Sequence, residues 1–162
     1  MDKTQIYAHL PLRVGVGIVL LNKQNKIFVG RRIDNPKNFW QMPQGGVDKE
    51  ENYLDAALRE LEEETSIKNI KLIREINYWL EYDLPPYLIG KIWKGKFKGQ
   101  KQKWFIMKFL GVDNEINLET RKPEFFEWKW ININDLTKVV VKFKLEVYKA
   151  IQKEILKIIK TK

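Results

Sequence analysis

The sequence predicts an α/β fold, with helices packed on a mixed β-sheet in a single domain over residues 1–162. Two patterns support this prediction. Apolar, β-branched stretches typical of strands occur near the start and in the middle of the chain. Two stretches at 51–65 and 143–160 have the apolar period of an amphipathic helix. The length of 162 residues also fits one domain, since domains typically hold about 100–200 residues.

The first predicted elements are a β-hairpin and a loop. Residues 14–22 are apolar and β-branched, residues 23–26 are polar and suited to a turn, and residues 27–32 return as a second strand. Residues 34–46 contain two prolines and the pair Gly45-Gly46, a composition that favours a loop. The chain is therefore expected to reach its first helix through this loop.

The remaining elements are one helix, three strands and a closing helix. In the first helix, one apolar face is formed by Leu54, Ala57, Leu58 and Leu61. The predicted strands cover 70–82, 102–111 and 125–131, and the basic stretch 91–103 is expected to be an exposed loop. The closing helix at 143–160 is amphipathic and has a basic face.

Composition excludes several classes of protein and of site. The chain has no cysteine, which excludes disulfides, thiolate metal sites and cysteine nucleophiles. Its one histidine, His9, leaves few options for histidine-based acid–base chemistry. No apolar run approaches the roughly 18–20 residues of a membrane span. We therefore expect a cytoplasmic protein without a membrane partner.

Charge is divided unevenly along the chain. Residues 48–64 hold eight acidic and two basic side chains, a net charge of −6, whereas the whole chain carries +9 and its remainder +15. An acidic segment inside a basic protein suggests bound cations at one place and a polyanionic substrate at another. A solvated acidic helix on a lysine-rich protein would produce the same pattern, so charge alone leaves both interpretations open.

Three glutamates of the first helix form the strongest candidate site. At 100° per residue, Glu60, Glu63 and Glu64 fall within an arc of about 100°, and the leucines of the helix face away from it. Carboxylates at this spacing repel one another unless a cation lies between them. Oxygen ligands without histidine or cysteine suit Mg²⁺ or Mn²⁺. A solvent-facing helix of good helix formers is the alternative.

The spacing around these glutamates resembles the Nudix box, here at about 45–67. Five residues separate Gly45 from Glu51, seven more precede Arg59-Glu60, and Glu63-Glu64 follow after two. The second glycine of the box is Ser66 in this chain, a change expected to weaken the left-handed end of the helix rather than the chemistry. The resemblance implies an α/β/α sandwich and hydrolysis of a nucleoside diphosphate linked to another moiety.

The resemblance also implies roles for the residues of the box. Glu60, Glu63 and Glu64 are expected to bind Mg²⁺ or Mn²⁺, with the Gly45 carbonyl as a further ligand, and one of the glutamates is expected to act as general base. Arg59 is expected to pair with Glu51 or with an acidic residue of the helix.

Stretches outside the box resemble those of the RNA pyrophosphohydrolases and the related dinucleoside polyphosphate hydrolases of this family. They cover 39–46, 82–85, 99–105, 123–125 with 128–130, and 140–144. The resemblance implies that the RNA end contacts Arg13, Arg32, Phe143 and Lys144. It also implies that Glu124 is a further carboxylate at the metals. Lys101 and Lys103 are further candidates for binding substrate phosphates, and Phe143 could instead begin the core of the closing helix.

The resemblance implies that the substrate is triphosphorylated RNA. Removal of pyrophosphate would leave a 5′-monophosphate that exposes the transcript to decay. Dinucleoside polyphosphates are an alternative substrate, because they share the phosphate chain and a terminal base. A non-catalytic RNA-binding module is a further alternative, although a pure binder would gain nothing from three glutamates facing RNA.

Overall fold

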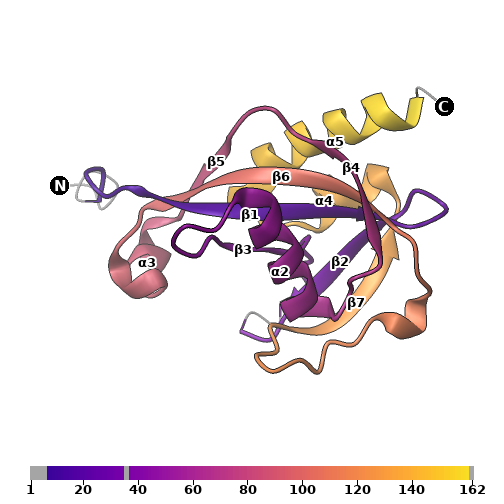
Figure 1. Cartoon of the computed structure of the whole chain (residues 1–162). Coiled ribbons are helices and arrows are strands. Elements are labelled where there is room, and N and C mark those ends of the chain that lie inside the picture. The colour runs from indigo at the N-terminus through magenta and orange to yellow at the C-terminus, as the bar shows by residue number, and fades with distance from the viewer. Residues whose placement is uncertain (1–6, 35–36, 161–162) are drawn as a thin grey trace.

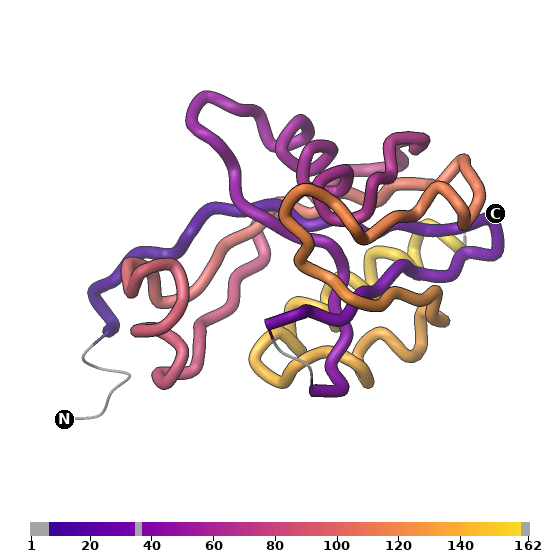
Figure 2. The backbone as a smooth tube through the Cα atoms, turned by 90° about the horizontal axis from the view of Figure 1, so that it is seen from below, coloured from indigo at the N-terminus to yellow at the C-terminus, as the bar shows by residue number. Residues whose placement is uncertain are grey.

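The computed structural model describes residues 7–34 and 37–160. Within them a mixed sheet lies between two longer helices, α2 (Tyr53–Thr65) and α5 (Leu145–Lys160), as Figures 1 and 2 show from two directions. The strands are β1 (Leu12–Leu21), β2 (Ile27–Arg32), β3 (Gln44–Gly46), β4 (Ile70–Glu75), β5 (Leu80–Asp83), β6 (Gly99–Phe109) and β7 (Phe125–Ile131). Short α3 (Pro86–Ile89) and α4 (Leu136–Val139) complete the α-helices among the described residues. The predicted α/β class is confirmed.

The parallel pair of β1 and β6 forms the centre of the sheet. The strand order is β4-β6-β1-β2-β7, while β3 pairs with β1 and β5 pairs with β6. On the side of β1 away from β6, β1 pairs with β3 at Gly15–Gly17 and with β2 near Leu21, and both pairs are antiparallel. The loop between β2 and β3 returns to the sheet, where Gln41 forms a bridge with Gly30.

The two faces of the sheet have separate apolar cores because side chains alternate along each strand. On one face, Ile18 of β1 and Phe105 of β6 pack with Leu61 of α2. On the other face, Val19 of β1 belongs to the core that includes Tyr148 of α5. This arrangement matches the α/β/α sandwich implied by the resemblance. Among the described helices, none combines the length and the apolar character of a membrane span.

The loop predicted over 34–46 is wrong at its end, where β3 forms. Glycine is disfavoured in strands because it has no side chain to pack. Here the ladder with β1 satisfies the backbone, and a Cβ at Gly45 would collide with the carboxylate of Glu60. The glycine is therefore required by close packing rather than by a turn. Residues 35 and 36 of this loop lie outside the described residues.

The single strand predicted over 70–82 is also wrong, because the segment forms β4 and β5 with a break at 76–79. Both strands pair with β6, and one long partner accommodates two short strands. The exposed basic loop predicted over 91–103 is wrong from Gly99 onward, where β6 begins. The end of this basic stretch forms a strand because β1 and β5 supply backbone partners on its two sides.

Candidate active site

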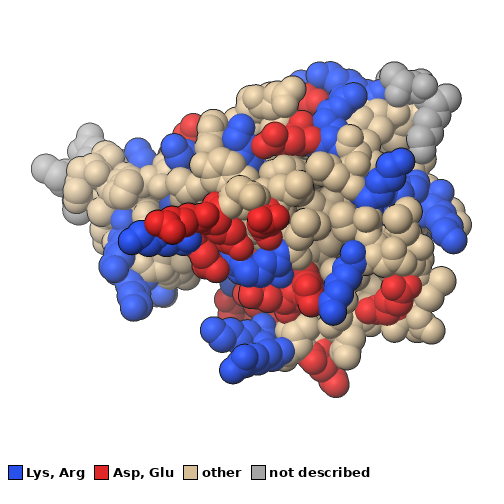
Figure 3. All heavy atoms as spheres, in the orientation of Figure 1, with Lys and Arg blue, Asp and Glu red and all other residues tan. Residues whose placement is uncertain are grey.

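Helix α2 carries the glutamates of the candidate site beneath an acidic surface, which basic side chains border (Figure 3). Its N-terminus is capped by Asn52, whose side chain accepts a 2.8 Å hydrogen bond from the backbone nitrogen of Asp55. Its C-cap is Ser66, which is left-handed at φ 69°. The structure therefore confirms that a residue other than glycine occupies the left-handed end of this helix.

The three predicted glutamates do not share one environment. Glu60 and Glu64 are buried, with residue exposures of 8% and 1%, whereas the side chain of Glu63 is 56% exposed. The ligand oxygens of Glu60 and Glu64 lie within 4.8 Å of one another and of Glu124, which directly precedes β7. The structure thus brings Glu124 to two of the helix glutamates and leaves Glu63 at the rim.

Burial makes this carboxylate cluster unfavourable without a cation. Both carboxylate oxygens of Glu64 are buried and lack a hydrogen-bond partner among the described residues. Burial, with Glu124 nearby, raises the pKa of Glu64 well above its usual value. Burial also raises the pKa of Glu60 to about 7, although the Arg59 guanidinium opposes the shift. The unpaired, buried oxygens of Glu64, with carboxylate oxygens of Glu60 and of exposed Glu124 beside them, are a donor set suited to a hard divalent cation.

Arg59 connects the box loop to the helix. Its Nε and Nη2 donate to the two carboxylate oxygens of Glu51, at 2.8 and 2.9 Å, and Nη2 also donates to the Gly46 carbonyl oxygen at 3.0 Å. Its Nη1 bonds to Glu60 at 2.9 Å and to Glu63 at 3.2 Å. The predicted pairing of Arg59 with Glu51 is confirmed, and helix acids bind it as well.

Arg32 and Lys144 bring positive charge near this cluster, and the charge of Glu64 acts on both of them. Arg32 forms a bidentate pair with Asp34, with distances of 2.6 and 2.7 Å, which raises the pKa of Arg32. Lys144 is buried and its Nζ donates to Oε1 of Gln41 at 3.3 Å. Burial lowers the pKa of Lys144 to about 7, and the charge of Arg32 acts in the same direction.

Aromatic rings lie beside Lys144. Its Nζ is 5.5 Å from the ring centroid of Tyr82 and 5.9 Å from that of Phe143. The rings of Tyr82 and Phe143 are 5.7 Å apart, and Phe143 packs half-buried against the core on this face. Phe143 therefore combines a packing contact with a position beside the buried cation.

The remaining predicted substrate-binding residues lie on two faces of the sheet. Arg13 stacks on Trp93 with its Cζ 5.2 Å from the ring centroid, and it approaches Gly46. Lys101 and Lys103 lie over Trp79, with Nζ 5.0 and 4.9 Å from its ring centroid. They alternate with Gln100 and Gln102, which are buried among residues of the opposite face. The structure does not bring these two lysines together with Arg32 and Lys144.

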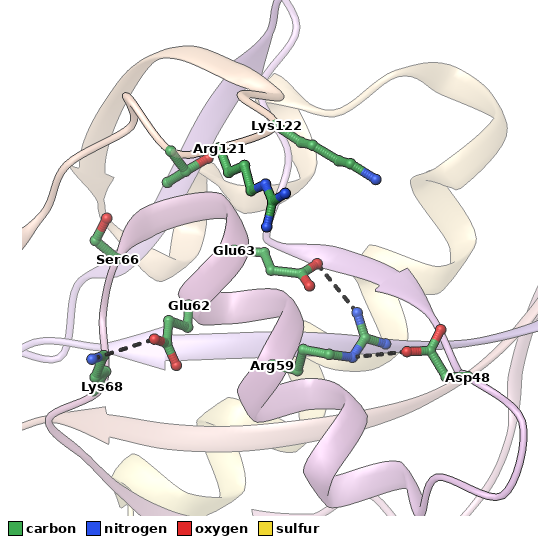
Figure 4. A pocket seen from close by; sticks show the side chains of 9 residues that line it. Asp48, Arg59, Glu62, Glu63, Ser66, Lys68, Arg121 and Lys122 are labelled. Atoms are coloured by element: carbon green, nitrogen blue, oxygen red, sulfur yellow. Dashed lines mark hydrogen bonds and ion pairs between the residues drawn. The ribbon is translucent and has the colours of Figure 1, made fainter.

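An open pocket of about 1060 Å³ adjoins Glu63. Figure 4 shows Glu63 turned toward Arg59 at the floor of this pocket, with Arg121 and Lys122 above. The wall thus contains both signs of charge. We did not predict these two cations, nor Asp34, Gln41 or Tyr82, as site residues. Gln41 and Tyr82 fall within stretches that resemble the subfamily, so the sequence held a signal for these two.

Comparison with known proteins decides the family. A model of the NUDIX domain matches residues 11–152. This chain belongs to the NUDIX family. The Nudix chain is 64% identical over 151 residues to the RNA pyrophosphohydrolase of Pelagibacter ubique, covering 93% of this chain and 96% of that protein. It is 46% identical over 153 residues to the RNA pyrophosphohydrolase of Orientia tsutsugamushi (strain Boryong), with coverages of 94% and 95%.

Solved structures share the Nudix fold. The E. coli dihydroneopterin triphosphate pyrophosphohydrolase superposes with a TM-score of 0.66 at 20% identity, covering 87% of this chain and 96% of that one. A C. elegans Ap4A hydrolase in a binary complex superposes with a TM-score of 0.62 at 18% identity, with coverages of 88% and 98%. At these identities the likeness shows the fold alone.

Proposed function

We propose that this Nudix hydrolase removes pyrophosphate from the triphosphorylated 5′ end of RNA and leaves a 5′-monophosphate. The observation that carries the proposal is the carboxylate cluster of Glu60, Glu64 and Glu124 beside the cations Arg32 and Lys144. Carboxylates suit a metal that binds bridging phosphates, and the cations suit the phosphates themselves. The RNA pyrophosphohydrolases that resemble this chain over most of its length add support.

We assign a divalent cation, Mg²⁺ or Mn²⁺, to the carboxylate cluster. The buried, unpaired oxygens of Glu64 fit such an ion, and Glu60 and Glu124 would complete the protein ligands together with Glu63 and the Gly45 carbonyl. The ion would neutralise the bridging phosphates and lower the pKa of a bound water.

The protein residues have three tasks in this reaction. Arg13, Arg32 and Lys144 bind and orient the phosphate chain, because guanidinium and ammonium groups form charge-assisted hydrogen bonds with phosphate oxygens. Phe143 stacks on an unpaired base next to the phosphates that Lys144 binds. Water attacks phosphorus, a phosphoanhydride P–O bond breaks and releases pyrophosphate, and Glu60, Glu63 or Glu64 takes the proton from the water.

A side-by-side comparison of substrates tests the proposal. Triphosphorylated RNA with an unpaired 5′ end and a dinucleoside tetraphosphate are supplied separately with Mg²⁺, and kcat/KM is measured from the released products. We expect pyrophosphate, or phosphate in steps, from the RNA, and little from RNA whose 5′ end is base-paired, since the first bases must be free to stack.

Two outcomes would replace the proposal. A preference of roughly 100-fold in kcat/KM for the dinucleoside tetraphosphate, equal to about 2.8 kcal/mol, would assign the chain to dinucleoside polyphosphates. RNA binding without any turnover in Mg²⁺ or Mn²⁺ would indicate a binding module. A chelator control, followed by return of the metal, separates loss of the ion from loss of the fold.

A further inference from the structure

Four side chains form a stack of rings and cations, which we call the Arg31 stack: Lys129 and Phe126 of β7, Arg31 of β2, and Trp40 of the loop between β2 and β3. Lys129 Nζ lies 4.1 Å from the ring centroid of Trp40. Arg31 Cζ lies 5.5 Å from the same ring and 4.8 Å from that of Phe126. The stack therefore alternates cation, ring, cation and ring, and it ends in Phe126, which is 48% exposed.

The Arg31 stack is continuous with the proposed site. Arg31 directly precedes Arg32, and Phe126 follows Glu124 by two residues. Trp40 directly precedes Gln41, the partner of Lys144, and lines a small pocket with Arg32 and Val141. A strand of RNA that leaves the proposed site over this pocket would therefore meet the stack next.

The charge of the Arg31 stack suits a polyanion. Arg31 pairs with Glu127 at 2.7 Å, and this ion pair holds the guanidinium between the two rings. Glu127 offsets the charge of Arg31, and Lys129 leaves the group with a net positive charge. Ile33 and Phe39 add exposed apolar surface next to it in sequence. Proteins that bind single-stranded nucleic acid combine basic side chains for the backbone with exposed rings for the bases. In the stack, Phe126 supplies the exposed ring and Arg31 and Lys129 supply the basic groups, while Trp40 is buried.

We propose that the Arg31 stack binds the single strand of RNA downstream of the 5′ nucleotides held at the proposed site. An unpaired base stacks on the exposed face of Phe126, and Arg31 and Lys129 contact the neighbouring phosphates. This inference rests on the proposed function, which it deepens by adding a preference for longer single-stranded RNA.

The test varies the length of the RNA and, independently, the side chains of the Arg31 stack. The substrates are a triphosphorylated dinucleotide and a triphosphorylated, unstructured RNA of roughly ten nucleotides with the same 5′ sequence, a length that such surfaces span. For the wild-type chain we expect a higher kcat/KM on the longer RNA. Phe126→Ala should lower kcat/KM on the longer RNA by at least ~5-fold, the lower end of one base–aromatic contact. It should leave the dinucleotide unchanged, and Phe126→Trp should retain the preference for length.

Matched controls separate stacking from structural damage. Tyr87→Ala removes another exposed ring, in α3, and should leave the preference for length intact. Fluorescence anisotropy with the longer RNA bearing a 5′-hydroxyl measures the binding of RNA to the stack without catalysis. Lys129→Gln should weaken that binding and make it depend less on salt concentration.

The outcomes distinguish this inference from the proposed function. Equal kcat/KM on both lengths in the wild-type chain would overturn the inference while leaving the proposed function intact. An equal loss on both lengths in Phe126→Ala would also overturn it, because the ring would then act by positioning Glu124. Absence of turnover at both lengths would overturn the proposed function, whereas loss of 5′-hydroxyl RNA binding in Phe126→Ala would still support the stack.

Discussion

At the scale of single residues, Glu64 has two buried carboxylate oxygens that lack a hydrogen-bond partner among the described residues, and burial raises its pKa. Glu64→Gln should therefore raise the free energy of unfolding at neutral pH in the absence of metal, because the amide avoids burial of a charge. The same change should lower kcat by at least ~10²-fold, the scale of one strong electrostatic contribution. Urea unfolding with chelator and steady-state turnover with Mg²⁺ measure the two effects.

A neighbour on the same helix provides the control for Glu64. Glu62 is exposed, pairs with Lys68 at 3.4 Å, and lies outside the carboxylate cluster. Glu62→Gln should leave both unfolding and turnover nearly unchanged, since exposed ion pairs contribute little. Wild-type turnover in Glu64→Gln would remove this residue from the metal site.

The pair of Glu51 and Arg59 predicts a dependence of stability on pH. Hydrogen bonds from Arg59 lower the pKa of Glu51 to about 2 from its usual 4.5. A carboxylate with a lowered pKa stabilises the fold above its unfolded value, and this contribution is lost as the pH falls from about 4.5 toward 2. Glu51→Gln should therefore lower the melting temperature at pH 7, and the difference from wild type should shrink over that acid range.

The adjacent residue makes this pH experiment specific. Glu50 is exposed, and Glu50→Gln should follow the wild-type melting curve across the same range. A constant difference between Glu51→Gln and wild type down to pH 2 would mean that packing, not ionisation, accounts for the role of Glu51.

At the scale of elements, the end of α2 combines strain with a hydrogen bond. Ser66 is left-handed, which disfavours a residue with a Cβ, and its hydroxyl donates to the Asn117 carbonyl oxygen at 2.8 Å. Ser66→Gly and Ser66→Ala both lose this bond, but only glycine relieves the backbone. Ser66→Gly should therefore be more stable than Ser66→Ala by about 1 kcal/mol in urea unfolding. Equal stability of the two variants would show that φ at this position costs nothing.

Element boundaries could be predicted where the signal was local. The helix expected at 51–65 is α2 at Tyr53–Thr65, because an apolar stripe and a cap specify it within a few turns. The glycine-rich β3 was missed because its partner, β1, lies about thirty residues earlier, and strand pairing at that distance leaves no local pattern.

At the scale of the whole molecule, α5 supports the loop that carries Gln41. The buried hydroxyl of Tyr148 accepts a 2.8 Å hydrogen bond from the backbone nitrogen of Met42, over one hundred positions away in the sequence. Tyr148→Phe leaves that buried N–H without a partner, which should lower the free energy of unfolding by about 1–3 kcal/mol. Urea unfolding measures this loss.

A surface tyrosine calibrates the result for Tyr148. Tyr87 is exposed, and Tyr87→Phe should change the free energy of unfolding by no more than about 0.5 kcal/mol. If Tyr148→Phe is equally mild, the Met42 nitrogen has found another partner, and α5 does not hold the site loop through this bond.

The sequence by itself determined the class of fold, the helix that carries Glu60 and Glu64, and the carboxylate side chains that this helix brings to the candidate site. These features depend on periodicity and on spacings within one helix or loop, which the chain specifies locally. The resemblance to the Nudix box also implied that Arg59 pairs with Glu51 or with an acidic residue of the helix, and the structure shows both pairs.

Only the tertiary structure decided which groups meet. Glu124 joins Glu60 and Glu64 because the connection from β6 to β7 returns it to the helix, sixty residues later in the chain. Burial then separates Glu60 and Glu64 from exposed Glu63, although these three glutamates fall on one arc of the helix. Strand alternation places Lys101 and Lys103 on the face opposite their buried neighbours. Which face is covered by which helix is settled by packing between distant segments, and no local pattern records it.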